Sequence, residues 1–510
     1  MSTVQSVKQE SLIKTFIFGS LIVLMVIIPF DEGGNGYILQ LMSQLVLLVC
    51  ATLWAIQIIR KRQLLIIPDK IDLCVLGFLL WAALSIHFAD YTYAAALEAI
   101  KILSYAALFY LCRSLYPLRG KRTILLAALL VSSGLQLIFA LYSSLILHTQ
   151  TLQAGFVNPN NLACFFVIGF NIALSFLLFH PQACHIIVAI RERKLNNPAF
   201  VSSLMIGICL GGLGLAVLAI RSRGAFIGLL GTGLFLTMLK KRSIGVIFLT
   251  IMCVVLLLPL PRGSLIQRLL KSHDPFAYQR VDIWKSSVRM MADHPITGVG
   301  LGMYKYYGPA YNFPVEHRIA RYGKRLDMAH NDLLQIGAEL GFIGVLLMLG
   351  GTIRIGYSAL TQLRRPPISW QTAAASAGLL GVFIQGLFSN LLASPAIAMA
   401  AAVLAGILLD KPIGSQRRHW AWSLPSKGIW QWYVGVAIFV FYLLVPVIGY
   451  PFFGYTNYRK YQEFRKTGNI PEAVYHLQRA LKLLPIQAYY HHTFGQLYAT
   501  AFRNQPNLDA

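Results

Sequence analysis

The chain has 510 residues, of which 56% are hydrophobic and only 12% charged, and its mean hydropathy is +0.61. This composition excludes a disordered chain and argues against a water-soluble globular enzyme. About 20 apolar residues cross the roughly 30 Å of hydrocarbon in a bilayer, so this chain can supply about a dozen spans. The excess of 44 Lys and Arg over 19 Asp and Glu must then be tested first against membrane topology.

Apolar segments recur along the chain and predict an all-α polytopic bundle of about 12–13 transmembrane helices. The first segment is followed by acidic residues and not by a cleavage site, so we expect it to be a retained anchor. The thirteen segments lie near residues 14–30, 37–59, 71–88, 95–115, 122–146, 160–180, 199–220, 224–239, 244–260, 331–356, 370–390, 393–410 and 431–451.

Lysine and arginine cluster in alternate loops between these segments, as the positive-inside rule requires when the amino terminus is cytoplasmic. The asymmetry places residues 261–330 and the carboxyl-terminal tail on the outer side. The inner loops hold most of the excess charge, so we do not expect nucleic acid as a partner. The basic residues of these loops are Arg60, Lys61, Arg62, Lys70, Arg113, Arg119, Lys121, Arg122, Arg191, Arg193, Lys194, Lys240, Lys241, Arg242, Arg364, Arg365, Lys411, Arg417, Arg418 and Lys427.

One predicted outer loop breaks this rule, because Arg221 and Arg223 stand between two apolar segments with no acidic residue nearby. Arginine is costly near hydrocarbon unless an anion receives its donors, and the next helix starts here with its positive end. A phosphate group is the natural ligand for such a site. The alternative is that both side chains snorkel to lipid headgroups.

The outer stretch 261–330 is too long for a simple connector. A helix is predicted to start at Asp274 and to stop at His294, with an amphipathic pattern between them. Its apolar face is predicted to consist of Ala277, Val281, Trp284, Val288 and Met291. Such a helix would lie on the membrane surface or over a cavity mouth, where Arg280 either faces a ligand or stays a solvated charge.

The rest of this stretch contains a glycine-rich turn and a histidine at a helix entrance. The segment from Gly298 to Gly302 does not follow a strand, so we interpret it as a turn and not as a dinucleotide-binding loop. Asn331 is a good helix cap and leaves His330 at the positive end of the next helix. That position favours a neutral imidazole, which can take a proton from a hydroxyl, although a lone histidine can equally be structural.

Asparagines at two helix entrances have two interpretations, since they can cap the helix or hydrogen-bond sugar hydroxyls. These asparagines are Asn158, Asn160, Asn161 and Asn331. Within the predicted spans, Glu98 and Lys101 are three residues apart and can neutralise each other. The acidic residues of the outer stretch are scattered, so we expect neither a metal site nor a cofactor.

From about residue 453 the chain changes into a soluble helical module. Small and aromatic residues occupy the positions of a tetratricopeptide repeat that ends at Pro485, and a second unit starts after it. The matching residues are Tyr461, Phe464, Gly468, Ala473 and Ala480, followed by Phe494, Gly495 and Tyr498. One and a half repeats cannot bury a core alone, so we expect this tail to pack on the 261–330 stretch or on a protein partner.

Taken in order, these features resemble the O-antigen ligase and polymerase superfamily of bacterial membrane glycosyltransferases. The resemblance covers roughly residues 150–410. It rests on Ser222-Arg223-Gly224, on Arg280-x-x-x-Trp284 with His294-Pro295-x-x-Gly298-x-Gly300, and on His330-Asn331-x-x-Leu334 with Glu339-x-Gly341-x-x-Gly344. It suggests N-terminal transmembrane helices over residues 1–146, a ligase-like core over 147–452 and a periplasmic tail over 453–510.

The resemblance implies a metal-independent, inverting transfer of a glycan from undecaprenyl diphosphate to an acceptor hydroxyl. The reaction would take place at the periplasmic face of the bacterial inner membrane, surrounded by membrane lipids. Arg223 and Arg280 would bind the diphosphate, Arg221 would assist them, and His330 would be the base. Because a diphosphate is a good leaving group, charge stabilisation and one base should suffice.

Three acceptors stay open at this point, namely lipid A core for a ligase, a growing glycan for a repeat-unit polymerase, and a protein for an O-glycosyltransferase. A flippase or transporter of lipid-linked sugars would also have about a dozen spans, but it should show internal repeats and broken helices at mid-membrane. A catalytically silent scaffold would depend on the tail and not on Arg223 or His330.

Overall fold

The computed structural model describes residues 2–61, 63–65, 69–114, 120–148, 152, 154–184, 198–257, 280–311, 315–316, 319–320, 326–409, 421–423 and 448–503. The chain divides into two compact units. Unit 1 comprises residues 1–35 and 65–421, and unit 2 comprises residues 36–64 and 422–510. The site considered below lies entirely in unit 1.

Helices account for nearly all regular structure in the described part of the chain. The elements are α1 (Ser2–Ile27), η1 (Ile28–Phe30), η2 (Glu32–Gly34), α2 (Tyr37–Lys61), β1 (Gln63–Leu65), α3 (Lys70–Ser85), α4 (Thr92–Ser114), α5 (Lys121–Leu145), α6 (Pro159–Phe179), α7 (Pro181–Cys184), α9 (Pro198–Ile220), α10 (Arg223–Lys240), α11 (Arg242–Leu257), α13 (Arg280–Asp293), α14 (Tyr304–Tyr307), η3 (Gly308–Tyr311), β2 (Val315–Glu316), β3 (Ile319–Ala320), α15 (Asp332–Leu363), α16 (Trp370–Gly386), α17 (Pro395–Leu409), β4 (Ala421–Ser423), α19 (Ile470–Leu483) and α20 (Ala488–Arg503). The short strands pair as β1 with β4 and as β2 with β3.

Seven of the described helices are long and apolar enough to cross a membrane, which makes the chain a multi-pass membrane protein. These candidate spans are Leu12–Phe30, Tyr37–Gln57, Thr92–Arg113, Lys121–Leu145, Pro159–Phe179, Phe200–Ile220 and Asp332–Leu363. Each of the first twelve apolar segments predicted from the sequence contains a described helix. The last, 431–451, lies mostly outside the described residues. The predicted all-α polytopic bundle is confirmed.

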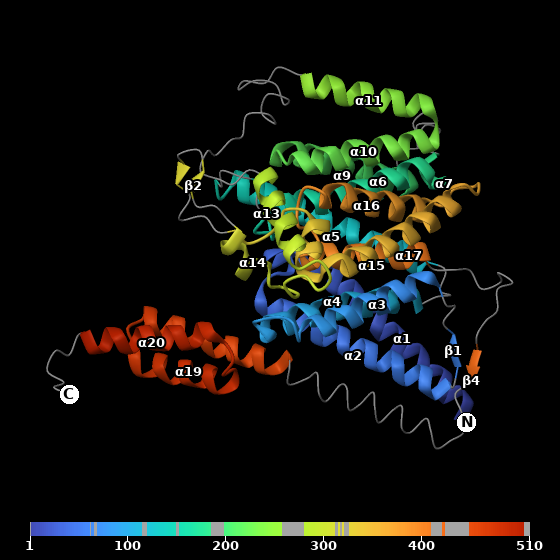
Figure 1. The fold of residues 1–510 in the computed structure, drawn as a ribbon. Coiled ribbons are helices and arrows are strands. Elements are labelled where there is room, and N and C mark those ends of the chain that lie inside the picture. The colour runs from blue at the N-terminus through green and yellow to red at the C-terminus, as the bar shows by residue number, and fades with distance from the viewer. Residues whose placement is uncertain are drawn as a thin grey trace. The chain divides into compact units, whose positions relative to one another are not determined.

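The centre of unit 1 is formed by α6, α10 and α16, which lie side by side (Figure 1). Small residues let their backbones approach, as is usual between membrane helices. A Cβ atom added to Gly381 would lie 3.1 Å from Val167 Cγ1, and one added to Gly228 would lie 3.6 Å from the Gly381 carbonyl oxygen. Asn171 Nδ2 donates to the Ala377 carbonyl at 3.2 Å. This packing fixes α10 and α16 against α6.

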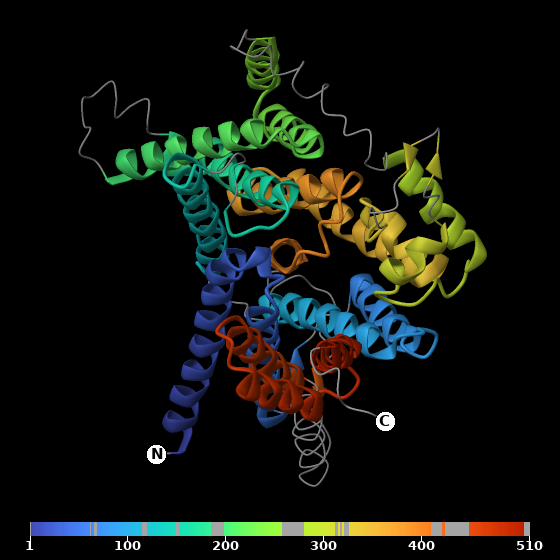
Figure 2. The same ribbon diagram turned by 90° about the vertical axis from the view of Figure 1, so that its left-hand side faces the viewer.

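The described part of the segment between α11 and α15 lies at one end of the long helices, where Figure 1 shows α13, α14 and β2, and Figure 2 shows it from the perpendicular direction. It is tied to a kink in α15 at Gly341, whose φ is +65°. A Cβ atom at Gly341 would collide with the Ile296 carbonyl oxygen, so only glycine fits. Beside it, Phe342 N–H donates to the Pro295 carbonyl at 2.8 Å.

The glycine-rich segment Gly298–Gly302 is a turn, as the sequence predicts. Gly298, Gly300 and Gly302 all have positive φ, which glycine adopts at little cost. The turn runs along the first part of α15, where Val299 N–H donates to the Ala338 carbonyl at 2.9 Å. It thereby anchors the segment that follows α13 to the same stretch of α15.

The face of α13 that packs inside the protein is not the predicted apolar face. The helix ends at Asp293, directly before the predicted stop, while its predicted start lies outside the described residues. Val281 and Val288, which the sequence places on the apolar face of this helix, are each 53% exposed. The buried face consists of Ile283, Ser286, Ser287 and Met290.

Hydrogen bonds explain why two serines, and not the valines, lie on the buried face of α13. Ser287 Oγ lies 2.7 Å from the Tyr304 hydroxyl, and Ser286 Oγ donates to the Tyr311 carbonyl at 2.9 Å. A buried hydroxyl with a partner is tolerated, whereas one without a partner is not. Burial raises the pKa of Tyr304 to about 12, so this phenol stays protonated and able to donate.

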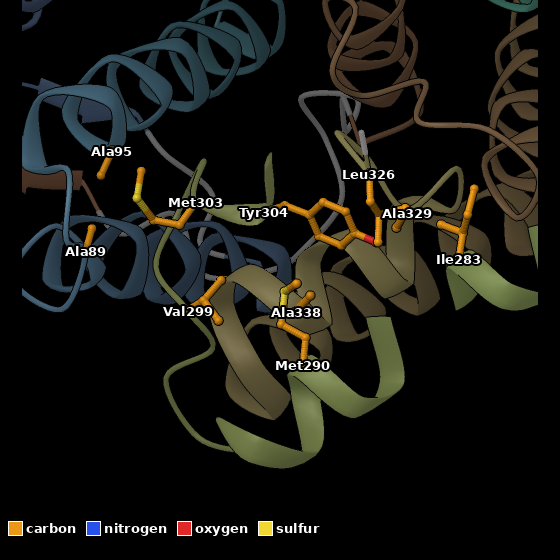
Figure 3. Packing of buried hydrophobic residues seen from close by; sticks show 10 residues of the cluster. All are labelled: Ala89, Ala95, Ile283, Met290, Val299, Met303, Tyr304, Leu326, Ala329 and Ala338. Carbon is orange, nitrogen blue, oxygen red and sulfur yellow. The ribbon is translucent and has the colours of Figure 1, made fainter. Parts of the chain in front are cut away.

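A cluster of buried hydrophobic residues packs α13 and the loop after it against α15 and the α3–α4 connection (Figure 3). The cluster consists of Ala89, Ala95, Ile283, Met290, Val299, Met303, Tyr304, Leu326, Ala329 and Ala338. Six of these residues are at most 1% exposed, and burial of a large apolar side chain such as Met290 or Met303 stabilises by about 1.5–3 kcal/mol. Ala329 belongs to this cluster, so the residue before His330 is fixed by packing.

Ion pairs connect α3, α4 and α15 at a distance from this segment. Asp69 caps α3, and its Oδ1 atom accepts a hydrogen bond from Arg354 Nε at 2.6 Å. Asp72 Oδ1 accepts a hydrogen bond from Arg113 Nη1 at 2.5 Å. In α4, Lys101 Nζ lies 2.5 Å from a Glu98 carboxylate oxygen, so these two residues pair as predicted. Charges within unit 1 are therefore neutralised where they serve packing.

Unit 2 contains a helical module built from residues 448–466, α19 and α20. Ala473, Leu477 and Ala480 on α19 are fully buried, and Tyr461 is 1% exposed. The rings of Tyr458 and Tyr490 stack with centroids 5.0 Å apart. The predicted helical tail is present, while its assignment as a tetratricopeptide-like repeat stays a prediction.

Candidate functional site

Two of the predicted phosphate-binding residues lie at the turn between α9 and α10. Arg221 adopts a left-handed conformation with a φ of +60°, and its side chain is exposed. Ser222 caps α10 by accepting from Ala225 N–H at 3.4 Å. Arg223 is the first residue of α10 and is exposed, so its guanidinium lies at the positive end of that helix.

The third predicted arginine, Arg280, begins the described part of α13 and is half-buried. Burial and then the positive charge of Arg223 lower the pKa of Arg280 below its ordinary value. Two guanidinium groups from separate helices therefore lie close enough to repel each other. Among the described residues, no carboxylate forms an ion pair with Arg280. An anion between these helix starts would remove the repulsion.

The predicted base, His330, precedes the cap of α15. Asn331 Oδ1 accepts from the N–H groups of Leu333 at 2.9 Å and Leu334 at 3.1 Å, which makes it the predicted cap. His330 is half-buried and has a φ of +50°, a conformation that costs a non-glycine residue about 1–3 kcal/mol. Burial and then the charge of Arg280 lower the pKa of His330. Its imidazole is therefore neutral at pH 7 and able to accept a proton.

The asparagines before α6 act mainly through the backbone. Asn158 caps the helix, because its side chain accepts from Asn160 N–H at 2.9 Å. The Asn160 carbonyl oxygen accepts from Gln385 Nε2, also at 2.9 Å. Asn161 is buried, and its Oδ1 has no hydrogen-bond partner among the described residues. Capping is therefore the structural role of Asn158, as it is of Asn331.

Residues 385–390, which we call the junction segment, join these helix starts. Gln385 reaches the start of α6 through the bond to Asn160. Phe388 contacts two further helices. A Cβ atom added to Gly224 on α10 would lie 3.3 Å from the Phe388 Cβ atom, and the ring centroids of Phe388 and Trp284 on α13 are 6.4 Å apart. Arg223 and Arg280 are, respectively, one residue before Gly224 and one helical turn before Trp284.

The junction segment reaches the start of α15 as well. Asn331 Nδ2 donates to the Leu387 carbonyl at 3.0 Å, and Asn331 N–H donates to Asn390 Oδ1 at 2.9 Å. The starts of α6, α10 and α15 and the first described turns of α13 are thus connected through six consecutive residues. Helix amino termini carry partial positive charge, so their grouping favours an anionic ligand.

The chemical capacity of this arrangement follows from its charges. Arg223 and Arg280 can donate several hydrogen bonds to an anion such as a diphosphate, and the helix termini add to the attraction. His330 feels the field of Arg280 and offers a neutral nitrogen beside it. An anion next to a base is suited to a reaction in which a hydroxyl attacks a carbon bound to a phosphate. The structure therefore brings together three of the residues predicted from the sequence.

Two side chains that the sequence analysis did not select also belong to this site. Gln335 Oε1 accepts from Ala329 N–H at 2.8 Å and from Asn390 Nδ2 at 2.7 Å. Gln335 is four residues after the cap of an apolar helix, and Asn390 is the last residue of the apolar segment 370–390. A polar residue at each of those places was the available signal. Their partners, however, are 6 and 55 residues away, which no local pattern reveals.

In the described part of the chain, no group of three or more His, Cys, Asp or Glu side chains is arranged to hold a metal ion. The nearest carboxylate to the helix cap, Asp332, instead accepts from Leu392 N–H at 3.3 Å. It thereby holds the segment after the junction against α15.

Comparison with known proteins gives a family for the part of the chain that contains Arg223, Arg280 and His330. Residues 205–349 match the model of the O-antigen ligase family. No curated protein matches the chain. The match supports a role in glycan transfer during polysaccharide biosynthesis, by an enzyme of the membrane glycosyltransferase type. Residues 205–349 therefore form a domain of the O-antigen ligase and polymerase superfamily.

Proposed function

We propose that the protein transfers a glycan from undecaprenyl diphosphate to an acceptor hydroxyl at the periplasmic face of the bacterial inner membrane. The single observation that carries the proposal is that the junction segment contacts the parts of α10, α13 and α15 that carry Arg223, Arg280 and His330. The region over residues 147–452 would act as the transfer core, and the matched family supports the reaction class.

In this proposal, the diphosphate of the donor binds between Arg223 and Arg280. Each guanidinium donates to phosphate oxygens, and the bound anion relieves the repulsion between the two cations. The positive ends of α10 and α15 add to the attraction. Arg221 assists from the preceding turn. The polyprenyl chain remains in the membrane beside these helices.

His330 acts as the base toward the acceptor. The acceptor oxygen attacks the anomeric carbon as its proton passes to the imidazole, and the bond from that carbon to the diphosphate oxygen breaks. Attack opposite the leaving group inverts the anomeric configuration. The leaving diphosphate keeps the negative charge, which Arg223 and Arg280 stabilise. This scheme assigns charge stabilisation to arginine and requires no metal ion.

The charge distribution of the sequence supports the proposed topology. Basic residues concentrate in alternate loops, so the amino terminus would be cytoplasmic, and the 261–330 stretch would be periplasmic. The tail over residues 453–510 would also be periplasmic. There it would bind a protein partner or the acceptor.

The test is transfer by the purified protein in liposomes, with a glycan on undecaprenyl diphosphate and with lipid A core as acceptor. Wild type and His330→Ala are compared, and the length of the lipid-linked glycan is followed in the same reaction. We expect glycan on lipid A core with wild type and at most a trace with His330→Ala. Lengthening of the lipid-linked glycan would identify a repeat-unit polymerase, and modification of a serine or threonine on an added protein acceptor would identify a protein O-glycosyltransferase.

The opposite result would be movement of the lipid-linked glycan between leaflets without any transfer. A fluorescent donor with leaflet-specific quenching measures this in the same liposomes. Equal scrambling by wild type and His330→Ala, with no new glycosidic bond, would contradict the proposal and favour a flippase or transporter.

A further inference from the structure

The backbone around His330 is held in a ring of hydrogen bonds that closes through two side chains. On one side, Ala329 N–H donates to Gln335 Oε1 at 2.8 Å. On the other side, Asn331 N–H donates to Asn390 Oδ1 at 2.9 Å. The two side chains are themselves joined, because Asn390 Nδ2 donates to Gln335 Oε1 at 2.7 Å.

The orientation of the Gln335 amide is determined by its second partner. Gln335 Nε2 donates to Glu339 Oε1 at 2.7 Å, one turn further along α15. The other carboxylate oxygen of Glu339 accepts from Gly302 N–H at 2.9 Å. With its nitrogen committed to a carboxylate, Gln335 must present its oxygen to Ala329 and Asn390. The ring is therefore continuous with the Gly298–Gly302 turn.

These bonds are not needed to begin the helix. Asn331 Oδ1 already caps α15 by accepting from Leu333 and Leu334, and Asn331 Nδ2 is used by the Leu387 carbonyl. What the ring adds is control over the peptide group that follows His330, through Asn331 N–H, and over the peptide group that precedes Ala329, through Ala329 N–H. That control is required, because His330 has a left-handed φ of +50°, which a histidine does not keep without support.

We propose that Gln335 and Asn390 are positioning residues, which hold His330 in its left-handed conformation and so aim its imidazole at the acceptor hydroxyl. The proposal rests on the proposed function, in which His330 is the base. Neither side chain would touch the donor or the acceptor. Losing the ring would move the imidazole while leaving the arginines in place, and a misplacement of about 1 Å can reduce a rate roughly 100-fold.

The first variant is Gln335→Met, which keeps the length of the side chain and removes its hydrogen bonds. The matched control is Gln362→Met on the same helix, where Gln362 Nε2 donates to the Leu408 carbonyl at 2.6 Å. We expect kcat of transfer to fall about 10- to 100-fold in Gln335→Met. Its affinity for undecaprenyl diphosphate should stay unchanged, and Gln362→Met should transfer as wild type does. If Gln335→Met does not fold, Asn390→Leu breaks the other side of the ring and gives the same comparison.

The decisive step repeats the substitution in the His330→Ala background. A residue that acts only through His330 has nothing left to position there, so Gln335→Met should cause no further loss of the residual rate. An additional loss of the same size in that background, or an unchanged kcat in the otherwise wild-type enzyme, would overturn this inference. A wild-type enzyme whose transfer does not depend on His330 would instead overturn the proposed function, so the two failures are distinguishable.

Discussion

Arginine is used in opposite ways in two regions of unit 1. Where α3, α4 and α15 meet, Arg354 and Arg113 are each paired with a carboxylate of the chain, from Asp69 and Asp72. At the joined helix starts, Arg280 is half-buried without a carboxylate partner among the described residues and is repelled by another arginine. The first arrangement is complete within the protein, whereas the second becomes favourable only when an anion binds.

The difference teaches how a structural arginine can be told from a binding arginine. Burial alone does not separate them, since both regions contain shielded guanidinium groups. What separates them is the source of the negative charge. The protein supplies it to Arg354 from the cap of α3, and a ligand must supply it to Arg280. Substitution of Arg280 and of Arg354 tests that distinction directly.

The largest effect should come from His330→Ala, because it removes the only group in the site assigned to proton transfer. We expect transfer to fall about 10²- to 10⁴-fold, the usual contribution of a general base. Thermal stability should change little, because an alanine in this left-handed conformation bears the same backbone strain as the histidine. His294→Ala is the control. The ring of His294 packs against that of Tyr307, with centroids 6.0 Å apart, and His294 has no assigned role in transfer. Full activity in His330→Ala would remove the basis for the proposed mechanism.

The second largest effect is expected in a comparison of the transfer rates and stabilities of Arg280→Gln and Arg354→Gln. Loss of a charge-assisted contact in the site is worth roughly 1.5–3 kcal/mol, so Arg280→Gln should lower kcat/KM about 10- to 100-fold. Its stability should be unchanged or higher, because repulsion by Arg223 disappears. Arg354→Gln should instead destabilise by about 3–5 kcal/mol, since it leaves the carboxylate of Asp69 buried without its partner. Thermal unfolding in detergent and initial transfer rates give both values. If the two variants exchanged these effects, the distinction would be wrong.

The third effect is a change in the pH dependence of transfer. His330 must be neutral to accept a proton, so kcat/KM should rise with pH as the imidazole loses its charge. Because burial and Arg280 lower the pKa of His330, the half-maximal point should lie below the ordinary histidine value of 6.5. Arg280→Gln should move that point to higher pH, as a repelling charge is removed. Rates measured from pH 4.5 to 8.5 in both proteins decide this, and a shift to lower pH would contradict it.

The smallest effect should come from Asn158→Ala. Removal of a helix cap costs about 1 kcal/mol of stability, and nothing else is lost if capping is the role of Asn158. We expect a slightly lower unfolding temperature with the KM for the donor unchanged. Asn158→Ser, which can still cap, is the control. An increase in KM that Asn158→Ser shares would indicate that the asparagine binds sugar.

The sequence predicted the helices of this protein better than their orientation. Apolar segments, glycine positions and caps are local signals, so α15 with its cap at Asn331 and the turn at Gly298 followed from them. The buried face of α13 did not, because Ser286 and Ser287 become suitable for burial only through hydrogen bonds to residues in the next loop. Hydropathy assigns a serine to the surface without knowing its partner.

The charged and basic residues of the site could be predicted from the sequence, whereas the side chains that hold His330 in place could not. Arg223 stood out because a charged group is costly at a membrane without a ligand, whereas Arg280 and His330 received their roles from the resemblance to the O-antigen ligase and polymerase superfamily. Gln335 and Asn390 carry no charge, and their significance comes from a contact across 55 residues. Such a ring becomes visible only when α15 and the end of α16 are placed side by side.

Binding of undecaprenyl diphosphate is the measurement that tests the central distinction most directly. Affinity is measured for purified wild type, Arg280→Gln and Arg354→Gln in the same detergent, with the folded fraction of each protein determined beforehand. We expect Arg280→Gln to bind at least about tenfold more weakly than wild type, and folded Arg354→Gln to bind as wild type does. Equal affinity of wild type and Arg280→Gln would contradict the conclusion that this arginine awaits an anionic ligand.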